Sequence, residues 1–220
     1  MATNRLRRGI VASIALAPLA ALVPSGARAQ PVLGRDYSVL SPEQPVEGAG
    51  KIDVVEFFWY GCIHCYNLEA LLEPWVPKLA PDAQFRRIPA VFDSPRWAHD
   101  AGLFFAFEAL GVLERLHRPI FDAVHKDRLR TDNPEALTEW LRKNGVDPKR
   151  LDDTLKSFGV QSKVRRATQL TRAFRVEGTP LLAIHGRYTI SAEQGRTHAG
   201  MLAIAEQLIG VARKGLASKK

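Results

Sequence analysis

The chain has 220 residues, of which 46% are hydrophobic and 25% charged, a composition typical of a globular protein and not of a disordered or fibrous one. The formal net charge is +8, but the first 29 residues contain four arginines and no acidic residue. Without them, 27 basic and 23 acidic residues leave a charge of +4, which argues against a nucleic-acid-binding protein.

Residues 1–29 have the pattern of a secretory signal peptide. Three arginines precede an apolar stretch over residues 10–23, and Ala27 and Ala29 provide the small residues that a signal peptidase reads. The alternative is a membrane anchor, but about 14 apolar residues fall short of the roughly 20 that a spanning helix needs. We therefore expect cleavage before Gln30, a soluble mature protein and an oxidising cell-envelope location.

The two cysteines of the chain stand three residues apart, between an expected strand and an expected helix. Residues 52–59 are apolar on both alternating faces and predict a central strand, and the helix that begins after Cys62 should end or kink at Pro74. Sulfurs one helical turn apart can close a disulfide. The free N–H groups and the positive dipole end of a helix would stabilise a thiolate at Cys62.

Two simpler interpretations of this C-x-x-C motif compete with redox chemistry. A structural disulfide across so short a loop would add little stability. A structural zinc site needs four ligands, and there is no second cysteine pair, although His64 and other histidines could contribute. The pattern of Cys62 and Cys65 therefore favours thiol–disulfide exchange.

The rest of the chain predicts a small mixed sheet with a helical segment inserted into it. A second strand is expected over 84–91. Helices are expected over 98–113, 119–125, 134–143, 148–158 and 162–174. Strands follow over 180–184 and 187–190, joined by a tight hairpin at His185 and Gly186, and a last helix covers 197–213. A short strand is expected over 37–40, before the first central strand.

Two segments and the insertion between them resemble the bacterial DsbA proteins. These segments are the run 54–66, which contains Cys62 and Cys65, and the later run 178–182, which contains Thr179 and Pro180. The resemblance implies an α/β thioredoxin fold, with a thioredoxin-like domain over 31–93 and 171–220 and a helical domain over 94–170. It also implies a periplasmic enzyme that oxidises thiols of exported proteins.

The resemblance further implies the partners and the second half of the site. Reduced exported proteins would be the substrates, and a quinone-linked membrane protein of the DsbB type would reoxidise the enzyme. Thr179 and a cis Pro180 would face the cysteines and bind an extended substrate peptide. An ordinary strand-entry turn at Pro180 is the alternative, since few X–Pro bonds are cis. We expect a monomer that needs no cofactor, metal or nucleic acid.

Roles for the other site residues follow from their chemistry. Cys62 should be the exposed, low-pKa sulfur that substrates attack, and Cys65 its more buried partner. His64 would supply a polar donor and a positive charge near Cys62, unless it is an incidental exposed residue. Ile63 departs from the proline of the best-known family members, which leaves the strength of the oxidant open.

Glu56 is an acidic residue in an otherwise apolar central strand. Its burial would be costly unless the carboxyl is solvated, protonated or paired. One hypothesis is a proton acceptor behind Cys65 with a raised pKa, and the other is a side chain that reaches solvent or a basic partner. Two other functions also remain open at this point: a disulfide reductase or isomerase, and a metal chaperone that uses Cys62, His64 and Cys65.

Overall fold

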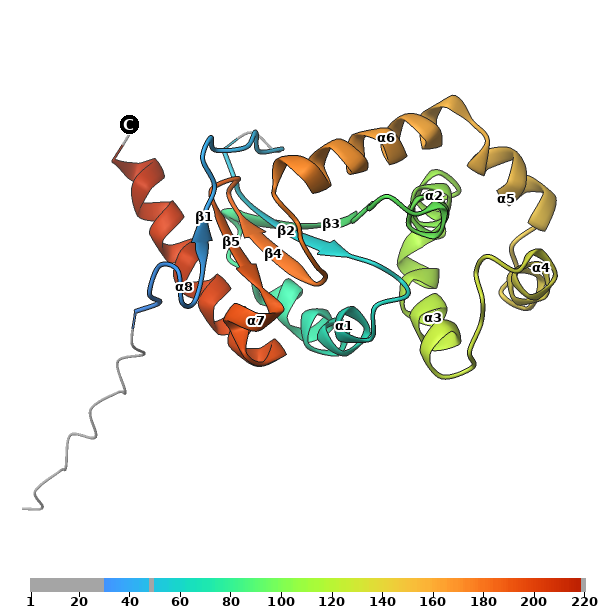
Figure 1. Cartoon of the computed structure of the whole chain (residues 1–220), viewed down its shortest axis with the longest axis horizontal. Helices are drawn as coiled ribbons and strands as arrows, with labels where there is room; N and C mark the ends of the chain where they lie inside the picture. Colours follow the sequence, from blue (N-terminus) through green and yellow to red (C-terminus); the bar gives the residue numbers. More distant parts are fainter. Residues whose placement is uncertain (1–29, 48–49, 219–220) are drawn as a thin grey trace, which may run out of the picture.

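The computed structural model describes residues 30–47 and 50–218 (Figure 1). The predicted signal peptide, residues 1–29, lies outside the described residues, and its cleavage stays a prediction. The described residues form five strands, which are β1 (Ser38–Val39), β2 (Ile52–Phe58), β3 (Ala83–Pro89), β4 (Leu181–Ile184) and β5 (Tyr188–Ser191).

The five strands form one mixed sheet in the order β1-β5-β4-β2-β3. β2 runs parallel to β3, with Ile52 opposite Ala83, and antiparallel to β4, with Phe57 opposite Leu181. This is the α/β arrangement that the sequence predicts, because a helix between β2 and β3 carries the chain back for a parallel pairing. β3 forms one edge of the sheet.

Five helices lie between β3 and β4, as the insertion pattern predicts. They are α2 (Pro95–Ala109), α3 (Leu113–His125), α4 (Pro134–Lys143), α5 (Pro148–Leu155) and α6 (Phe158–Ala173). The remaining helices are α1 (Ile63–Trp75), the short 3-10 helix η1 (Val76–Lys78), α7 (Ala192–Gly195) and α8 (His198–Ala217). The exact domain limits at residues 94 and 171 stay a prediction.

Helices cover both faces of the sheet and bury the central strand completely (Figure 1). Ile52 and Val54 of β2 belong to a hydrophobic cluster with α1 and α8. Val55 and Phe57 point to the opposite face and belong to a cluster with α6 and the other inserted helices. The alternation of side chains along a strand therefore explains why β2 is apolar on both faces.

Several helix limits differ from the prediction for identifiable reasons. α3 begins at Leu113 and not at Pro119, because Leu116 and Ile120 are fully buried on one face and this burial outweighs the cost of a proline inside the helix. α6 begins at Phe158, where the side chain of Ser157 caps it by accepting from the Val160 N–H. The single turn α7 was not predicted.

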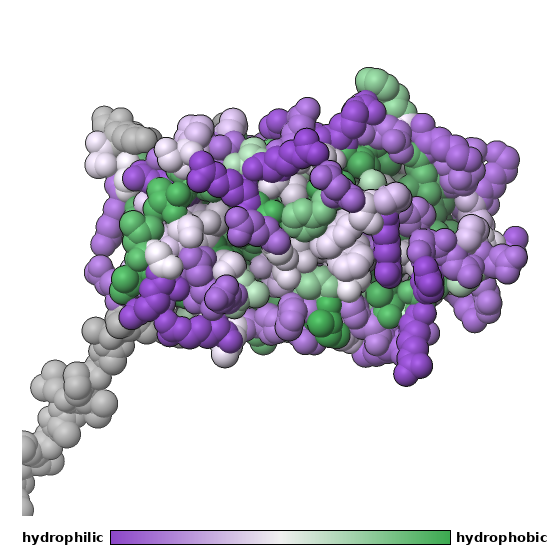
Figure 2. All heavy atoms as spheres, in the orientation of Figure 1, coloured by the Kyte–Doolittle hydropathy of each residue, from purple (hydrophilic) through white to green (hydrophobic). Residues whose placement is uncertain are grey.

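The predicted hairpin between β4 and β5 is present. His185 and Gly186 have left-handed φ angles of 51° and 66°, and the Arg187 N–H donates to the Ile184 carbonyl oxygen at 3.1 Å across them. Ile184 pairs with Tyr188, so the connection has three residues. The face shown in Figure 2 carries mostly hydrophilic side chains with smaller hydrophobic areas between them. Among residues 30–47 and 50–218, no helix has the length and hydropathy needed to cross a membrane.

Candidate active site

Cys62 lies where the chain leaves β2 and enters α1. It is the N-cap residue of α1, with extended backbone angles of φ −90° and ψ 115°. Its Sγ accepts a hydrogen bond from the Cys65 N–H at 3.4 Å, so the sulfur occupies the place that an N-cap oxygen usually takes. The first turn of α1 contains no acidic residue, and nothing there opposes a negative charge on the sulfur.

These contacts lower the pKa of the Cys62 thiol to about 5. The largest cause is the hydrogen bond from the Cys65 side chain, and further hydrogen bonds come from the Thr179 side chain and from the backbone N–H groups of Cys65 and His64. Partial burial opposes the shift. The neutral thiol instead donates to the Thr179 carbonyl oxygen at 3.2 Å, an interaction that a thiolate gives up.

Cys65 lies one turn into α1 and is fully buried. Burial raises the pKa of its thiol well above the usual value, and the neighbouring Cys62 and Glu56 raise it further. Both cysteines are free thiols in this structure. The helix start therefore separates two chemically different sulfurs, one that ionises readily and one that holds its proton, as the sequence predicts.

Thr179 and Pro180 face the first sulfur from the start of β4. The hydrogen bond from Cys62 to the Thr179 carbonyl joins segments that are 117 residues apart in the sequence. The Thr179–Pro180 peptide bond is cis, as the resemblance implies. The two segments predicted to share a site thus lie in contact.

His64 is exposed, and its contribution to the low pKa of Cys62 comes from its backbone N–H. Its imidazole ring lies 6.0 Å, centroid to centroid, from that of His198 at the start of α8. Burial lowers the pKa of His198, the charge of His64 lowers it further, and the charge of Cys62 raises it. His198 therefore lies within electrostatic reach of the sulfur, and the sequence did not indicate this.

Glu56 is buried in the sheet and has a basic partner, and its role as a proton acceptor stays a prediction. Its exposed fraction is 1%, and Arg87 Nε lies 3.4 Å from Glu56 Oε2. Neither carboxyl oxygen accepts a hydrogen bond from any described residue. Burial raises the pKa of Glu56 to about 8, against the opposing charge of Arg87.

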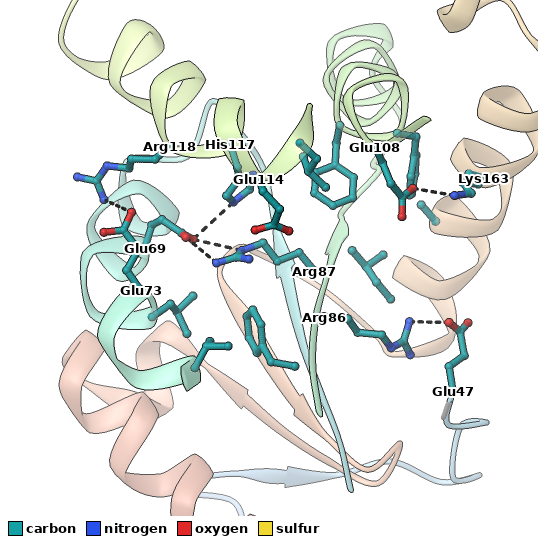
Figure 3. A pocket seen from close by; sticks show the side chains of 18 of the residues that line it. Glu47, Glu69, Glu73, Arg86, Arg87, Glu108, Glu114, His117, Arg118 and Lys163 are labelled. Carbon is teal, nitrogen blue, oxygen red and sulfur yellow. Dashed lines mark hydrogen bonds and ion pairs between the residues drawn. The ribbon is translucent and has the colours of Figure 1, made fainter. Parts of the chain in front are cut away.

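A buried charged cluster that the sequence analysis missed adjoins Glu56. Arg87 Nη2 donates to Glu69 Oε1 at 2.5 Å, and His117 Nε2 lies 3.6 Å from Glu69 Oε2 (Figure 3). Burial would raise the pKa of Glu69, but its contacts with His117 and Arg87 hold the pKa below its ordinary value. Tyr60 OH lies 3.1 Å from the other ring nitrogen of His117. The cluster joins β2, β3, α1 and α3.

An apolar hollow of about 610 Å³ adjoins Cys62. Trp59 and Trp97 form one wall, with their rings stacked at a centroid distance of 4.1 Å. Asp100 fixes the Trp59 ring by accepting from its Nε1 at 2.6 Å. Gly61 leaves room for this ring, because a Cβ atom there would collide with it. Exposed Ile63 also lines the hollow.

The described residues contain no group of three or more His, Cys, Asp or Glu side chains placed to hold a metal ion. Cys62, His64 and Cys65 thus do not converge on a common point there. What the site does combine is a dithiol, a helix N-terminus and a buried carboxyl. This set of groups can perform thiol–disulfide exchange coupled to proton transfer.

Comparisons with known proteins agree with this geometry. Residues 75–199 match the family model described as a DSBA-like thioredoxin domain. The chain is 36% identical over 200 residues to the thiol:disulfide interchange protein DsbA of Azotobacter vinelandii, covering 91% of this chain and 93% of the relative. It is 38% identical over 171 residues to the corresponding protein of Burkholderia cepacia, covering 77% and 80%.

Solved structures give the same result for the fold. The crystal structure of Pseudomonas aeruginosa DsbA matches with a TM-score of 0.79 and 35% identity, over 86% of this chain and 97% of that chain. DsbA from Xylella fastidiosa matches with a TM-score of 0.77 and 32% identity, over 84% and 98%. The chain therefore has the thioredoxin fold and belongs to the DsbA family of thiol:disulfide oxidoreductases.

Proposed function

We propose that this protein introduces disulfide bonds into exported proteins through a Cys62–Cys65 disulfide. A substrate thiolate attacks Sγ of Cys62, the Cys62–Cys65 bond breaks, and its electron pair leaves on Cys65, which takes up a proton. The second substrate thiolate then attacks the substrate sulfur of the mixed disulfide. The substrate disulfide forms, Cys62 leaves as a thiolate, and two electrons have passed to the enzyme.

The position of Cys62 as the N-cap of α1 is the observation that carries this proposal. Hydrogen bonds at the helix start stabilise the Cys62 thiolate, and the pKa of that thiol falls to about 5. A stabilised thiolate is both a good leaving group and a feature of the reduced enzyme only. Stabilisation of the reduced form makes the disulfide a stronger oxidant, which favours an oxidase over a reductase.

Glu56 would exchange a proton with Cys65. With a pKa of about 8, its carboxyl holds a proton near neutral pH and can give it to the leaving Cys65 sulfur. The carboxylate would take the proton back when Cys65 attacks during reoxidation. The charge of Glu56 raises the pKa of Cys65, and the charge of Cys62 raises the pKa of Glu56, which supports a role for Glu56 beside the two sulfurs.

The cellular setting and the partners belong to the same proposal. The signal-like residues 1–29 support export to the periplasm, where a disulfide persists. Family membership supports unfolded, reduced exported proteins as substrates and a DsbB-type quinone-linked membrane oxidase as the reoxidising partner. Thr179 and Pro180, together with the apolar hollow beside Cys62, would bind the substrate backbone and its side chains. We propose that the protein acts as a monomer.

The test is the reduction potential of the Cys62–Cys65 couple, measured by equilibration with glutathione, together with the oxidation rate of a reduced dithiol peptide. We expect a potential well above that of a thioredoxin-type reductant and rapid peptide oxidation. A reducing potential, or rescue of scrambled disulfides faster than oxidation of reduced chains, would instead identify a reductase or an isomerase. Stoichiometric bound metal with negligible oxidase activity would identify a metal chaperone.

Replacement of Glu56 by glutamine tests the proton transfer and has a stability signature of its own. Because the pKa of Glu56 rises from 4.5 to about 8 on folding, its stability contribution is full below pH 4.5 and lost as the pH rises through 8. Glu56→Gln avoids this loss. The gain of the variant over the wild type should grow as the pH rises from 4.5 and reach roughly 2–4 kcal/mol by pH 8. The variant should also form mixed disulfides with substrates more slowly, because Cys65 then leaves without this proton donor.

Urea unfolding of the reduced proteins at pH 5 and pH 8 measures the difference in stability. Quenched-flow kinetics measures the rate of the mixed-disulfide step. Glu73→Gln is the matched control, because Glu73 is a half-exposed acid on α1 whose loss should change neither quantity. A stability difference between Glu56→Gln and the wild type that is equal at both pH values would contradict the raised pKa.

A further inference from the structure

A second cavity, a groove of about 710 Å³, follows the outer edge of β3. It shares no lining residue with the hollow beside Cys62. Figure 3 shows α1 on one side of β3, α6 on the other, and α2 and α3 above the end of the strand. β3 is seven residues long and, among residues 30–47 and 50–218, pairs only with β2, so one of its edges borders this groove without a neighbouring strand from these residues.

The free edge of β3 presents backbone groups that have no partner within the described parts of the chain. The Ala90 N–H donates to the Phe58 carbonyl at 2.8 Å, so even-numbered residues of this segment bond to β2. The register is one to one, so the odd-numbered residues turn their N–H and C=O groups outward. Phe85 and Arg87 are therefore two such residues, and both line the groove.

The walls of the groove offer contacts on both faces of an added strand. On the α1 side the apolar wall is formed by Val76 and Pro77 at the end of the helix. On the opposite side it is formed by Phe104, Phe105 and Leu170. Side chains of an extended chain alternate between the two faces of a sheet, so a strand beside β3 would place alternate side chains against each wall.

We propose that this edge binds an extended segment of an unfolded polypeptide by adding it to the sheet next to β3. The kind of ligand follows from the spacing of the outward-facing N–H and C=O groups of β3. Donors and acceptors that repeat every second residue match an extended backbone and do not match a helix or a small molecule. Main-chain hydrogen bonds do not depend on the sequence of the segment, so the site accepts chains of many sequences.

A second folded copy of this protein fits the edge poorly. Helices stand on both sides of β3, and an identical copy would bring the same helices to the contact (Figure 3). The two β3 edges would be held apart. A single extended chain has no such flanking elements and can enter between α1 and α6.

This inference rests on the proposed function, since it assigns the groove to the substrates of the oxidase. A long unfolded substrate would contact the enzyme at β3 as well as at Cys62, which raises its local concentration at the sulfur. A short dithiol peptide would contact only the site at Cys62. The groove therefore selects long unfolded chains over short peptides without touching the reacting atoms.

Amide hydrogen exchange on the reduced full-length protein tests the binding directly. The probe is reduced, carboxymethylated α-lactalbumin, which is unfolded and has no free thiol. The amides of Phe85 and Arg87 should exchange fast in the free protein and slow by at least about fivefold when the probe is present. The amides of Gln84 and Arg86, which face β2, serve as internal controls and should be protected in both states.

A pair of variants at Phe85 isolates the backbone donor. Phe85→Pro and Phe85→Ala both remove the ring, but only proline removes the N–H, and this N–H takes no part in the ladder with β2. Phe85→Pro should raise the KM for reduced, unfolded α-lactalbumin by about three- to tenfold relative to Phe85→Ala. Both variants should oxidise a short dithiol peptide equally well.

Three outcomes would overturn the proposal. The first is unchanged exchange at Phe85 and Arg87 with the probe present. The second is an equal KM of the two variants for the long substrate. The third is protection of these amides by self-association, detected by sedimentation without the probe. Failure of the wild type to oxidise either substrate would instead overturn the proposed oxidase function and would leave the exchange result standing.

Discussion

Replacement of Cys62 by serine should reduce dithiol oxidation to the uncatalysed rate, whereas Cys65→Ser should capture substrates as stable mixed disulfides. The structure gives the two thiols different acidities. The pKa of Cys62 is about 5, and the pKa of buried Cys65 is well above the usual value. Once Cys62 is linked to a substrate, Cys65 is the sulfur that can release it within the enzyme. Serine preserves the size of the side chain and removes only the sulfur chemistry.

Non-reducing electrophoresis measures this capture after incubation with an unfolded protein that carries a single thiol. Oxidised glutathione supplies the two oxidising equivalents, and no second substrate thiol is present to release the adduct. The double variant Cys62→Ser/Cys65→Ser is the control for nonspecific association and should form no adduct. Capture by Cys62→Ser and none by Cys65→Ser would reverse the assignment of the nucleophile and the partner.

The reduced protein should gain stability over the oxidised protein as the pH rises from 5 towards 9. The pKa of Cys62 falls from 9.0 in the unfolded chain to about 5 in the folded one. The contribution of the Cys62 thiolate to the stability of the reduced protein is therefore complete above pH 9, partial at pH 7, and lost as the pH falls through 5. At pH 7 the gap from the folded pKa corresponds to about 2.7 kcal/mol, and solvent screening of the partly exposed sulfur reduces this to roughly 1–2 kcal/mol.

Denaturant unfolding of both redox forms at pH 4, 7 and 9 measures the difference. The oxidised form is the matched control, because its sulfurs cannot ionise and the effect of its cross-link on the unfolded chain does not vary with pH. A stability difference that stays constant over this range would show that Cys62 is not a stabilised thiolate.

The features predicted correctly from the sequence depend on local patterns. β2, the C-x-x-C turn and α1 follow one another without interruption, so apolar alternation and helix-start chemistry were enough to place Cys62 and Cys65. The hairpin at His185 and Gly186 is equally local. Contact between Cys62 and Thr179 came from family resemblance, because no local pattern indicates it.

The buried charged cluster could not be predicted in this way. Glu69, Arg87 and His117 come from α1, β3 and α3, and each looks like an ordinary surface residue in its own segment. Glu56 gave a signal because it interrupts an apolar strand, but the identity of its partner required the register of β2 against β3, which places Arg87 directly opposite. Helix limits at Leu113 and Phe158 were missed because tertiary burial and a serine cap outweighed the proline and spacing signals.

The separation of Cys62 from Thr179 by 117 residues affects how the enzyme folds during its synthesis. A chain is made from its N-terminus, so the two cysteines leave the ribosome long before the segment that faces them. Until β4 arrives, Cys62 lacks both its Thr179 contact and the strand beside β2. The newly made enzyme is then itself an unfolded thiol protein and competes with its future substrates for oxidation. Its ability to select substrates begins only when the final strands and α8 complete the sheet.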